Sequence, residues 1–206
     1  MTRFVKWGLG GSLVLIGLML IGSTFLRNEL TAATSADVVE SLTVHRPTEG
    51  DFDFTAVGPL EWKDVTSVRN RFHDLPTIGV ISIADVSLEL PILYGLSPEN
   101  LAVGAGTMRP SQTMGQGNYA LAGHYMNRTD ILFGPLHEVT TGMLIQLSDL
   151  THTYTYRITS IETVAPTRVD VLDETDEATI TLVTCTFNAT ERLIVKGTLL
   201  AENASF

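Results

Sequence analysis

Cysteine is almost absent from this chain of 206 residues, in which Cys185 is the only one. A single cysteine cannot form an internal disulfide, so a domain outside the cytoplasm would depend on its hydrophobic core for stability. The thiol is then either a small buried hydrophobic group or a reactive group. Which of the two it is depends on the residues that accompany it.

Positive charge is also scarce. Beyond residue 26 the chain holds 11 basic and 23 acidic residues, a net charge of −12. Proteins that bind nucleic acid need clustered Lys and Arg to neutralise phosphates, so we expect no nucleic-acid partner. The length is sufficient for one ordinary domain and a membrane anchor.

Charge is missing altogether from residues 7–26, and most of this segment is strongly apolar. In a helix these twenty residues would extend about 30 Å, which is the thickness of the bilayer core. Arg3 and Lys6 precede the segment, and the first acidic residue is Glu29. The positive-inside rule therefore predicts a cytoplasmic N-terminus at residues 1–6, a transmembrane anchor at 7–26 and an extracellular remainder.

The competing interpretation of this segment is a cleaved signal peptide, with small residues such as Ala32 and Ala36 near the cleavage site. The apolar stretch is longer than the signal-peptide core of about 7–15 residues, which favours the uncleaved anchor. We therefore expect a single-pass protein of the cell membrane with its domain outside.

The rest of the chain changes character twice. Residues 27–50 are rich in Thr, Ser and Ala without an apolar period, which predicts a linker or stalk. Residues 59–72 show loosely helical apolar spacing, which predicts a short helix. Further on, near-alternation of apolar residues predicts strands at 78–83, 86–92, 119–124, 143–147, 153–164, 179–186 and 193–200. Many short strands and few helices predict that residues 51–206 form a mainly β domain, a single closed or nearly closed β-barrel.

Three polar residues that can act on a carbonyl group lie at the ends of predicted strands: Cys185, His124 and Arg192. A thiol needs a base or a nearby cation to supply thiolate at neutral pH, and histidine can also protonate a leaving amine. If the last two strands form a hairpin, the Arg192 guanidinium returns close to the thiol and can stabilise an oxyanion. The alternatives are a buried inert cysteine, a solvated arginine and a different histidine. The other histidines are His45, His73, His137 and His152.

The segments around these residues resemble the active-site segments of sortases, the cysteine transpeptidases of Gram-positive bacteria. They read ALAGH at 120–124, TLVTC at 181–185 and ERLIVKG at 191–197. Residues 75–83, 90–93 and 104–106 resemble the first half of the sortase barrel. The similarity covers roughly residues 50–200 in family order, and the class A (housekeeping) group is the most similar. It implies an eight-stranded barrel with a few short helices, preceded by the transmembrane helix.

The resemblance also implies an activity. A sortase of this kind cleaves an LPXTG-like sorting signal between Thr and Gly and transfers the surface protein to an amine of the cell-wall precursor lipid II. Cys185 would attack the Thr carbonyl and form a thioacyl enzyme. His124 would act as general acid and base, and Arg192 would bind the substrate backbone or stabilise the oxyanion.

The same resemblance implies where the sorting signal would bind. The loop 164–178 would hold its Leu-Pro, with Val169, Val171 and Leu172 lining that pocket. From the strands, Ala122 and Thr184 would face the groove. The alternative is that these apolar residues only pack the loop onto the barrel.

Metal ligands are sparse where some class A sortases bind calcium. The loop 104–118 contains no Asp or Glu, and calcium needs clustered oxygen ligands. We therefore expect no metal and no other cofactor. The later acidic run is interpreted as a solvated turn; it consists of Asp173, Glu174, Asp176 and Glu177.

Three other functions remain open from the sequence. A cysteine hydrolase on the same fold would share the acyl intermediate and differ only in its acceptor. A non-catalytic cell-surface binding barrel would leave Cys185, His124 and Arg192 without a joint purpose. A pilus-polymerising sortase often carries an N-terminal lid with an acidic-aromatic motif and a C-terminal membrane segment, and we expect neither in this chain.

Overall fold

The structure is a computed structural model. It describes the chain except for residues 1, 42–48, 55–56, 70, 127, 187–188 and 205–206. The side chains of residues 2–15, 21 and 72 also lie outside the description.

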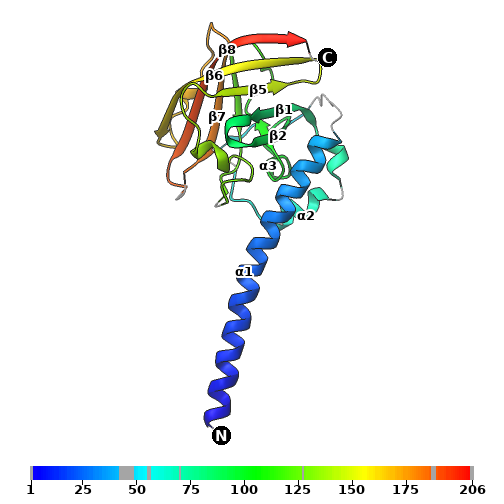
Figure 1. Cartoon of the computed structure of the whole chain (residues 1–206), viewed down its shortest axis with the longest axis vertical. Coiled ribbons are helices and arrows are strands. Elements are labelled where there is room, and N and C mark those ends of the chain that lie inside the picture. The colour runs from blue at the N-terminus through cyan, green and yellow to red at the C-terminus, as the bar shows by residue number, and fades with distance from the viewer. Residues whose placement is uncertain are drawn as a thin grey trace.

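Eight strands close into one barrel in the order β1-β2-β3-β4-β7-β8-β6-β5 (Figure 1). Most neighbours are antiparallel, whereas β2 with β3 and β4 with β7 are parallel. The eight-stranded barrel expected from the resemblance is therefore confirmed. The strands are β1 (Thr77–Ile83), β2 (Leu88–Leu93), β3 (Ala105–Thr107), β4 (Asn118–Ala122), β5 (Leu144–Ser148), β6 (His152–Val164), β7 (Thr179–Cys185) and β8 (Arg192–Ala204).

Helical elements are short apart from the first. The long helix is α1 (Thr2–Glu40), and the predicted short helix is present as α2 (Trp62–Arg69). The others are α3 (Pro98–Leu101) and the 3-10 turns η2 (Phe72–Asp74), η3 (Ala84–Val86), η4 (Gly134–His137) and η5 (Asp170–Leu172).

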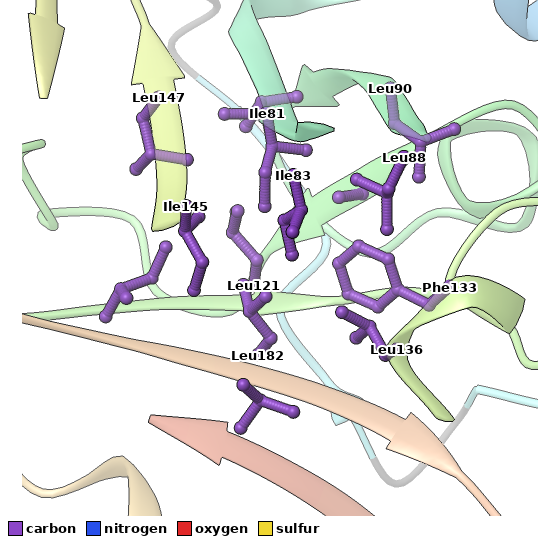
Figure 2. Close-up of a cluster of buried hydrophobic side chains, with 14 of the residues drawn as sticks. Ile81, Ile83, Leu88, Leu90, Leu121, Phe133, Leu136, Ile145, Leu147 and Leu182 are labelled. Carbon is purple, nitrogen blue, oxygen red and sulfur yellow. The ribbon is translucent and has the colours of Figure 1, made fainter. Parts of the chain in front are cut away.

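The interior of the barrel is filled by alternating apolar residues. In β1 buried and half-buried positions alternate along the whole strand, as expected when one face points into a core. Ile81 and Ile83 meet Leu121 of β4 and Leu182 of β7 in this cluster, with Phe133 beside them (Figure 2). Each such side chain contributes about 1.5–3 kcal/mol on full burial, so this cluster stabilises the barrel.

Strands β4 and β7 are buried on both faces. All five residues of β4 are buried: Tyr119 and Leu121 face the barrel core, whereas Ala120 and Ala122 belong to a second cluster on the outer face. Val183 of β7 joins this outer cluster. Apart from Asn118, Thr181 and Thr184, the buried positions of the two strands are apolar, and the outer face of the strands forms the floor of the site described below.

The range 27–50 was expected to be a linker, but α1 continues through it as far as Glu40. Asn28, Thr31, Ser35 and Val38 are buried at helical spacing, and Val38 packs with Val65 of α2. The helical period is carried by small polar residues instead of apolar ones, so the apolar pattern did not reveal it. The first part of α1 projects away from the barrel, whereas this part lies against it (Figure 1).

The expected transmembrane segment at 7–26 lies within α1, and the side chains of residues 7–15 and 21 are outside the description. Among the residues that the structure does describe, none of the helices combines the length and the apolar character needed to cross a membrane.

Candidate active site

Two parallel strands, β4 and β7, bring the predicted histidine and cysteine to the same end of the barrel. In the register of β4 with β7, Ala122 lies opposite Val183, and the Gly123 amide donates a hydrogen bond to the Val183 carbonyl at 3.1 Å. His124 follows Gly123, and Cys185 ends β7 two residues beyond Val183. Parallel neighbours end on the same side of a sheet, so the two side chains reach one pocket.

A hairpin brings the arginine to this same end of the barrel. Strands β7 and β8 are antiparallel, and Cys185 lies directly opposite Arg192. The connection is closed by the Thr186 amide, which donates to the Glu191 carbonyl at 3.1 Å, and by Ala189 at φ 57°. The hairpin on which the Arg192 prediction depended is therefore present.

The three side chains line one cavity of about 570 Å³. Ala122 and Thr184, which were expected to face the groove, line it as well. Two parts of the chain that sequence reasoning did not connect with the site complete the wall. They are the α1 residues Thr24, Arg27 and Asn28, and the segment that contains Phe54, Val57, Gly58, Pro59 and Leu60.

Burial controls the protonation of the histidine. Desolvation lowers the pKa of His124 to about 4, and the negative charge of Asp64 opposes this shift only in part. The imidazole is therefore neutral at pH 7. A neutral imidazole has a free ring nitrogen that can take the thiol proton.

Polar atoms at the site lack partners among the described residues. Arg192 Nε and Thr184 Oγ1 are buried without a hydrogen bond there. The other Arg192 contacts are long, with Nη1 at 3.4 Å from the Ala189 carbonyl and 3.3 Å from the Glu191 carbonyl. An unpaired buried polar group costs about 1–3 kcal/mol. A bound ligand that supplies acceptor oxygens here would remove this cost and so bind more tightly.

A covering segment, residues 51–54 and 57–60, lies over the groove. The Phe54 ring centre is 5.7 Å from Arg192 Cζ, and Phe54 and Val57 pack on the outer cluster of β4 and β7. The segment is attached where the Leu96 amide donates to the Asp51 carbonyl at 2.6 Å. We expected no lid, and this prediction was wrong, because it overlooked residues 51–54, which read Asp-Phe-Asp-Phe and alternate acidic with aromatic side chains.

Replacing Phe54 by alanine should expose the thiol. The ring fills space in front of Arg192 in the pocket that holds Cys185. We expect alkylation of Cys185 by iodoacetamide at pH 7 to become several-fold faster, since Cys185 is the only thiol to be modified. Phe54→Leu, which keeps most of the apolar volume, should give a smaller increase. An unchanged rate in Phe54→Ala would show that the ring does not limit access.

The loop residues predicted to hold a substrate differ in their placement. Val171 is 4% exposed and belongs to the outer cluster, and Leu172 packs against that cluster. Val169 is 70% exposed, and none of the three residues is among those that line the cavity, so their role in holding a substrate stays a prediction. Val169 directly precedes η5, two residues before the buried Val171, and its side chain faces solvent.

His137 lies beside the site and makes a contact with Cys185 that sequence reasoning missed. Its Nε2 lies 3.2 Å from the Cys185 carbonyl oxygen, and its ring centre is 4.5 Å from that of Tyr125. The contact is to the backbone of Cys185, so His137 supports the end of β7, whereas His124 lines the cavity with the thiol. No spacing in the sequence indicates this contact.

No group of three or more His, Cys, Asp or Glu side chains that could hold a metal ion occurs in the described part of the chain. The acidic run at 173–177 is exposed, as predicted. Glu174 departs from the prediction of a purely solvated turn, because its Oε1 lies 2.7 Å from Nη1 of Arg109.

Comparisons with known proteins agree with this geometry. The sortase domain family matches residues 81–200. Sortase A of Streptococcus agalactiae is 39% identical over 96% of this chain and 85% of its own length. Sortase A of Listeria monocytogenes is 35% identical over 91% of this chain and 88% of its own length. The crystal structure of the Listeria monocytogenes enzyme has a TM-score of 0.62 and covers 63% of this chain and 91% of that chain.

A closed barrel with a thiol, an imidazole and a guanidinium at one pocket, taken with these similarities, defines a cysteine transpeptidase that anchors surface proteins. The chain belongs to the sortase family. The resemblance seen in the ALAGH and TLVTC segments is thereby confirmed.

Proposed function

We propose that this chain cleaves an LPXTG-like sorting signal between Thr and Gly and transfers the surface protein to an amine of a cell-wall precursor, lipid II. The observation that carries the proposal is the single cavity lined by Cys185, His124 and Arg192. A non-catalytic binding barrel gives this combination no joint role.

The residues divide the reaction between them. His124 takes the thiol proton while Cys185 Sγ bonds to the Thr carbonyl carbon, and the negative charge that develops on oxygen is stabilised by Arg192. Collapse of this intermediate breaks the Thr–Gly C–N bond, and the His124 imidazolium gives its proton to the leaving Gly amine. The acceptor amine then attacks the thioester, its proton passes to His124, and the displaced thiolate takes that proton back.

The sorting signal would lie along the outer face of β4 and β7. Ala122 and Thr184 line the cavity next to the thiol, and Val171 and Leu172 form an apolar wall of the adjoining cluster. An apolar wall with few polar groups suits a Leu-Pro pair, which offers no side-chain hydrogen bonds. Occupation by substrate requires Phe54 to leave its place on this cluster.

We also propose that residues 7–26 anchor the chain in the cell membrane, with residues 1–6 in the cytoplasm and the barrel outside. The support is the charge-free sequence of this part of α1, which projects away from the barrel (Figure 1). Large apolar side chains at Ile16, Leu18, Met19, Leu20, Phe25 and Leu26 are each more than half exposed.

Mass spectrometry of Cys185 after incubation with an LPXTG peptide tests the proposal directly. A thioacyl adduct ending at Thr is expected, and an intact thiol with uncleaved peptide would refute the proposed substrate. Adding a glycine or alanine amine should convert the product from the free acid to the amide. Release of free acid at the same rate, with no amide, would favour a hydrolase.

Arg192→Lys should lower kcat/KM for an LPXTG peptide by roughly tenfold to a hundredfold, because lysine keeps the charge but loses the planar fork. Steady-state kinetics measures the loss. Arg157→Lys is the matched control, since Arg157 is an exposed residue of β6, and it should stay within about twofold of wild type. Equal activity of the two variants would exclude Arg192 from the reaction.

A further inference from the structure

The loop between β6 and β7, residues 165–178, is held to the barrel by polar bonds to the start of β4. Its buried residue Val171 and the adjoining Leu172 contribute to the outer cluster beneath the groove. The chain on either side of them is exposed, so apolar packing alone holds little of the loop. The polar bonds therefore decide where this wall of the groove lies.

Asn118, the first residue of β4, makes several of these bonds and is 2% exposed. Its Nδ2 donates to the carbonyls of Val171 at 3.2 Å and Asp173 at 3.0 Å. Its Oδ1 accepts a hydrogen bond from Thr181 Oγ1 of β7 at 2.7 Å. Both donors of the amide are satisfied on the loop, and its acceptor is satisfied on the neighbouring strand.

Arg109 completes the attachment from the connection between β3 and β4. Its Nη1 donates to the Leu172 carbonyl at 3.2 Å and lies 2.7 Å from Glu174 Oε1. Its Nη2 donates to the Asn118 carbonyl. The other Glu174 oxygen, Oε2, accepts a hydrogen bond from the backbone N–H of Asn118 at 3.2 Å. One guanidinium thus joins the loop, its carboxylate and β4.

The backbone next to Asn118 is adapted to this contact. Gly117 has φ 52°, a left-handed conformation that favours glycine. A Cβ at Gly117 would lie 2.5 Å from Glu174 Oε2, so any larger residue would displace the carboxylate. Glycine therefore allows Glu174 to approach both Arg109 and the Asn118 amide.

We propose that Arg109, Asn118 and Glu174 are positioning residues that hold the 165–178 loop in its substrate-binding arrangement. The inference rests on the proposed function, in which this loop forms a wall for the sorting signal. The Leu172 carbonyl and the Glu174 carboxylate of the loop converge on Arg109 together with the Asn118 carbonyl of β4, and these acceptors require a cation or strong donors. The planar fork of Arg109 supplies both from within the chain, and a lysine in its place would supply a single point charge.

Arg109→Gln should raise KM for an LPXTG peptide about tenfold while kcat stays within about twofold, as expected when a charge-assisted hydrogen bond to a binding wall is lost. The KM of Arg109→Lys should lie between those of wild type and Arg109→Gln. Glu174→Gln, a substitution at an exposed position, should also raise KM. Arg168→Gln is the matched control, because the only side-chain ion pair of Arg168 among the described residues is with Asp170 inside the same loop, at 2.6 Å. It should change KM less than twofold.

Amide hydrogen exchange in the loop gives a second readout. Arg109→Gln should speed exchange at residues 170–174 and leave β5 and β6 unchanged, whereas Arg168→Gln should leave 170–174 protected. An unchanged KM in Arg109→Gln, or equal effects of the two substitutions, would overturn the proposal. A several-fold rise in wild-type kcat/KM on adding calcium would do the same, since the loop would then not be held already.

Thioacylation of wild-type Cys185 by the peptide distinguishes a failure of this inference from a failure of the proposed function. If the wild type forms no adduct, the proposed function fails before the loop is tested. If the wild type forms the adduct and the Arg109 variants show normal KM, only the positioning role fails.

Discussion

Cys185→Ala should reduce cleavage of an LPXTG peptide to background, a loss of at least about 10⁴-fold, because no other thiol exists to form the acyl intermediate. Cys185 is half-buried at the end of β7, and the substitution removes only its sulfur. The barrel should therefore keep its circular dichroism spectrum and its Tm within a few degrees. Peptide cleavage followed by chromatography, together with the mass of the protein, measures both expectations.

Cys185→Ser is the companion variant. It preserves size and polarity but offers a much poorer nucleophile, so it should be as inactive as Cys185→Ala and still bind the peptide. Turnover retained in either variant would exclude Cys185 as the nucleophile. Loss of the folded barrel would point instead to a structural role for the thiol.

His124→Ala should lower kcat/KM by roughly 10²–10⁴-fold, the range for loss of a general acid–base catalyst. Desolvation lowers the pKa of His124 to about 4, so this imidazole in the cavity of the thiol is unprotonated at pH 7 and has a free nitrogen that can act as the base. Peptide cleavage at pH 7 measures the effect. His137→Ala is the control, because His137 contacts the Cys185 backbone carbonyl and the Tyr125 ring and does not line the cavity, and its effect should stay within a few-fold. The reverse order of effects would mean that His137 is the catalytic histidine.

The same substitution has a signature in stability. Between pH 6.5 and about 4 the unfolded chain binds a proton at His124 and the folded chain does not. The free energy of unfolding contributed by this residue therefore falls as the pH drops through that window. Urea unfolding at pH 7 and pH 5 should show a smaller loss in His124→Ala than in wild type. An equal loss in both would show that the buried imidazole does not stay neutral.

Local patterns predicted most of the barrel. Alternation identified seven strands and missed β3, whose three residues Ala105–Thr107 are too few to show a period. The buried face of α1 beyond residue 26 escaped because Asn28, Thr31 and Ser35 carry its helical spacing. The positions of Cys185, His124 and Arg192 at strand ends indicated that they lie together, because parallel and hairpin pairing bring these strand ends to one end of the barrel.

The contacts that sequence reasoning missed join parts of the chain that are far apart. Phe54 meets Arg192, Arg109 meets Glu174, and His137 meets the Cys185 carbonyl. Each contact depends on how a connection crosses the outside of the barrel, and no periodicity records such a path. The exposure of Val169 was equally unpredictable, since the turn at η5 that buries Val171 leaves the preceding residue in solvent.

The parallel pairing of β4 with β7 has a consequence for folding. Between these neighbours in space the chain completes β5 and β6, so the pair forms only after a long loop has been closed. Contacts between residues so distant in sequence form slowly, because the entropy of loop closure must be overcome first. We therefore expect the thiol and its base to meet late, since a chain in which only β1 to β4 have formed holds His124 without Cys185. Closing the barrel with β7 and β8, which complete the core, is thus also the step that brings Cys185 and Arg192 to His124.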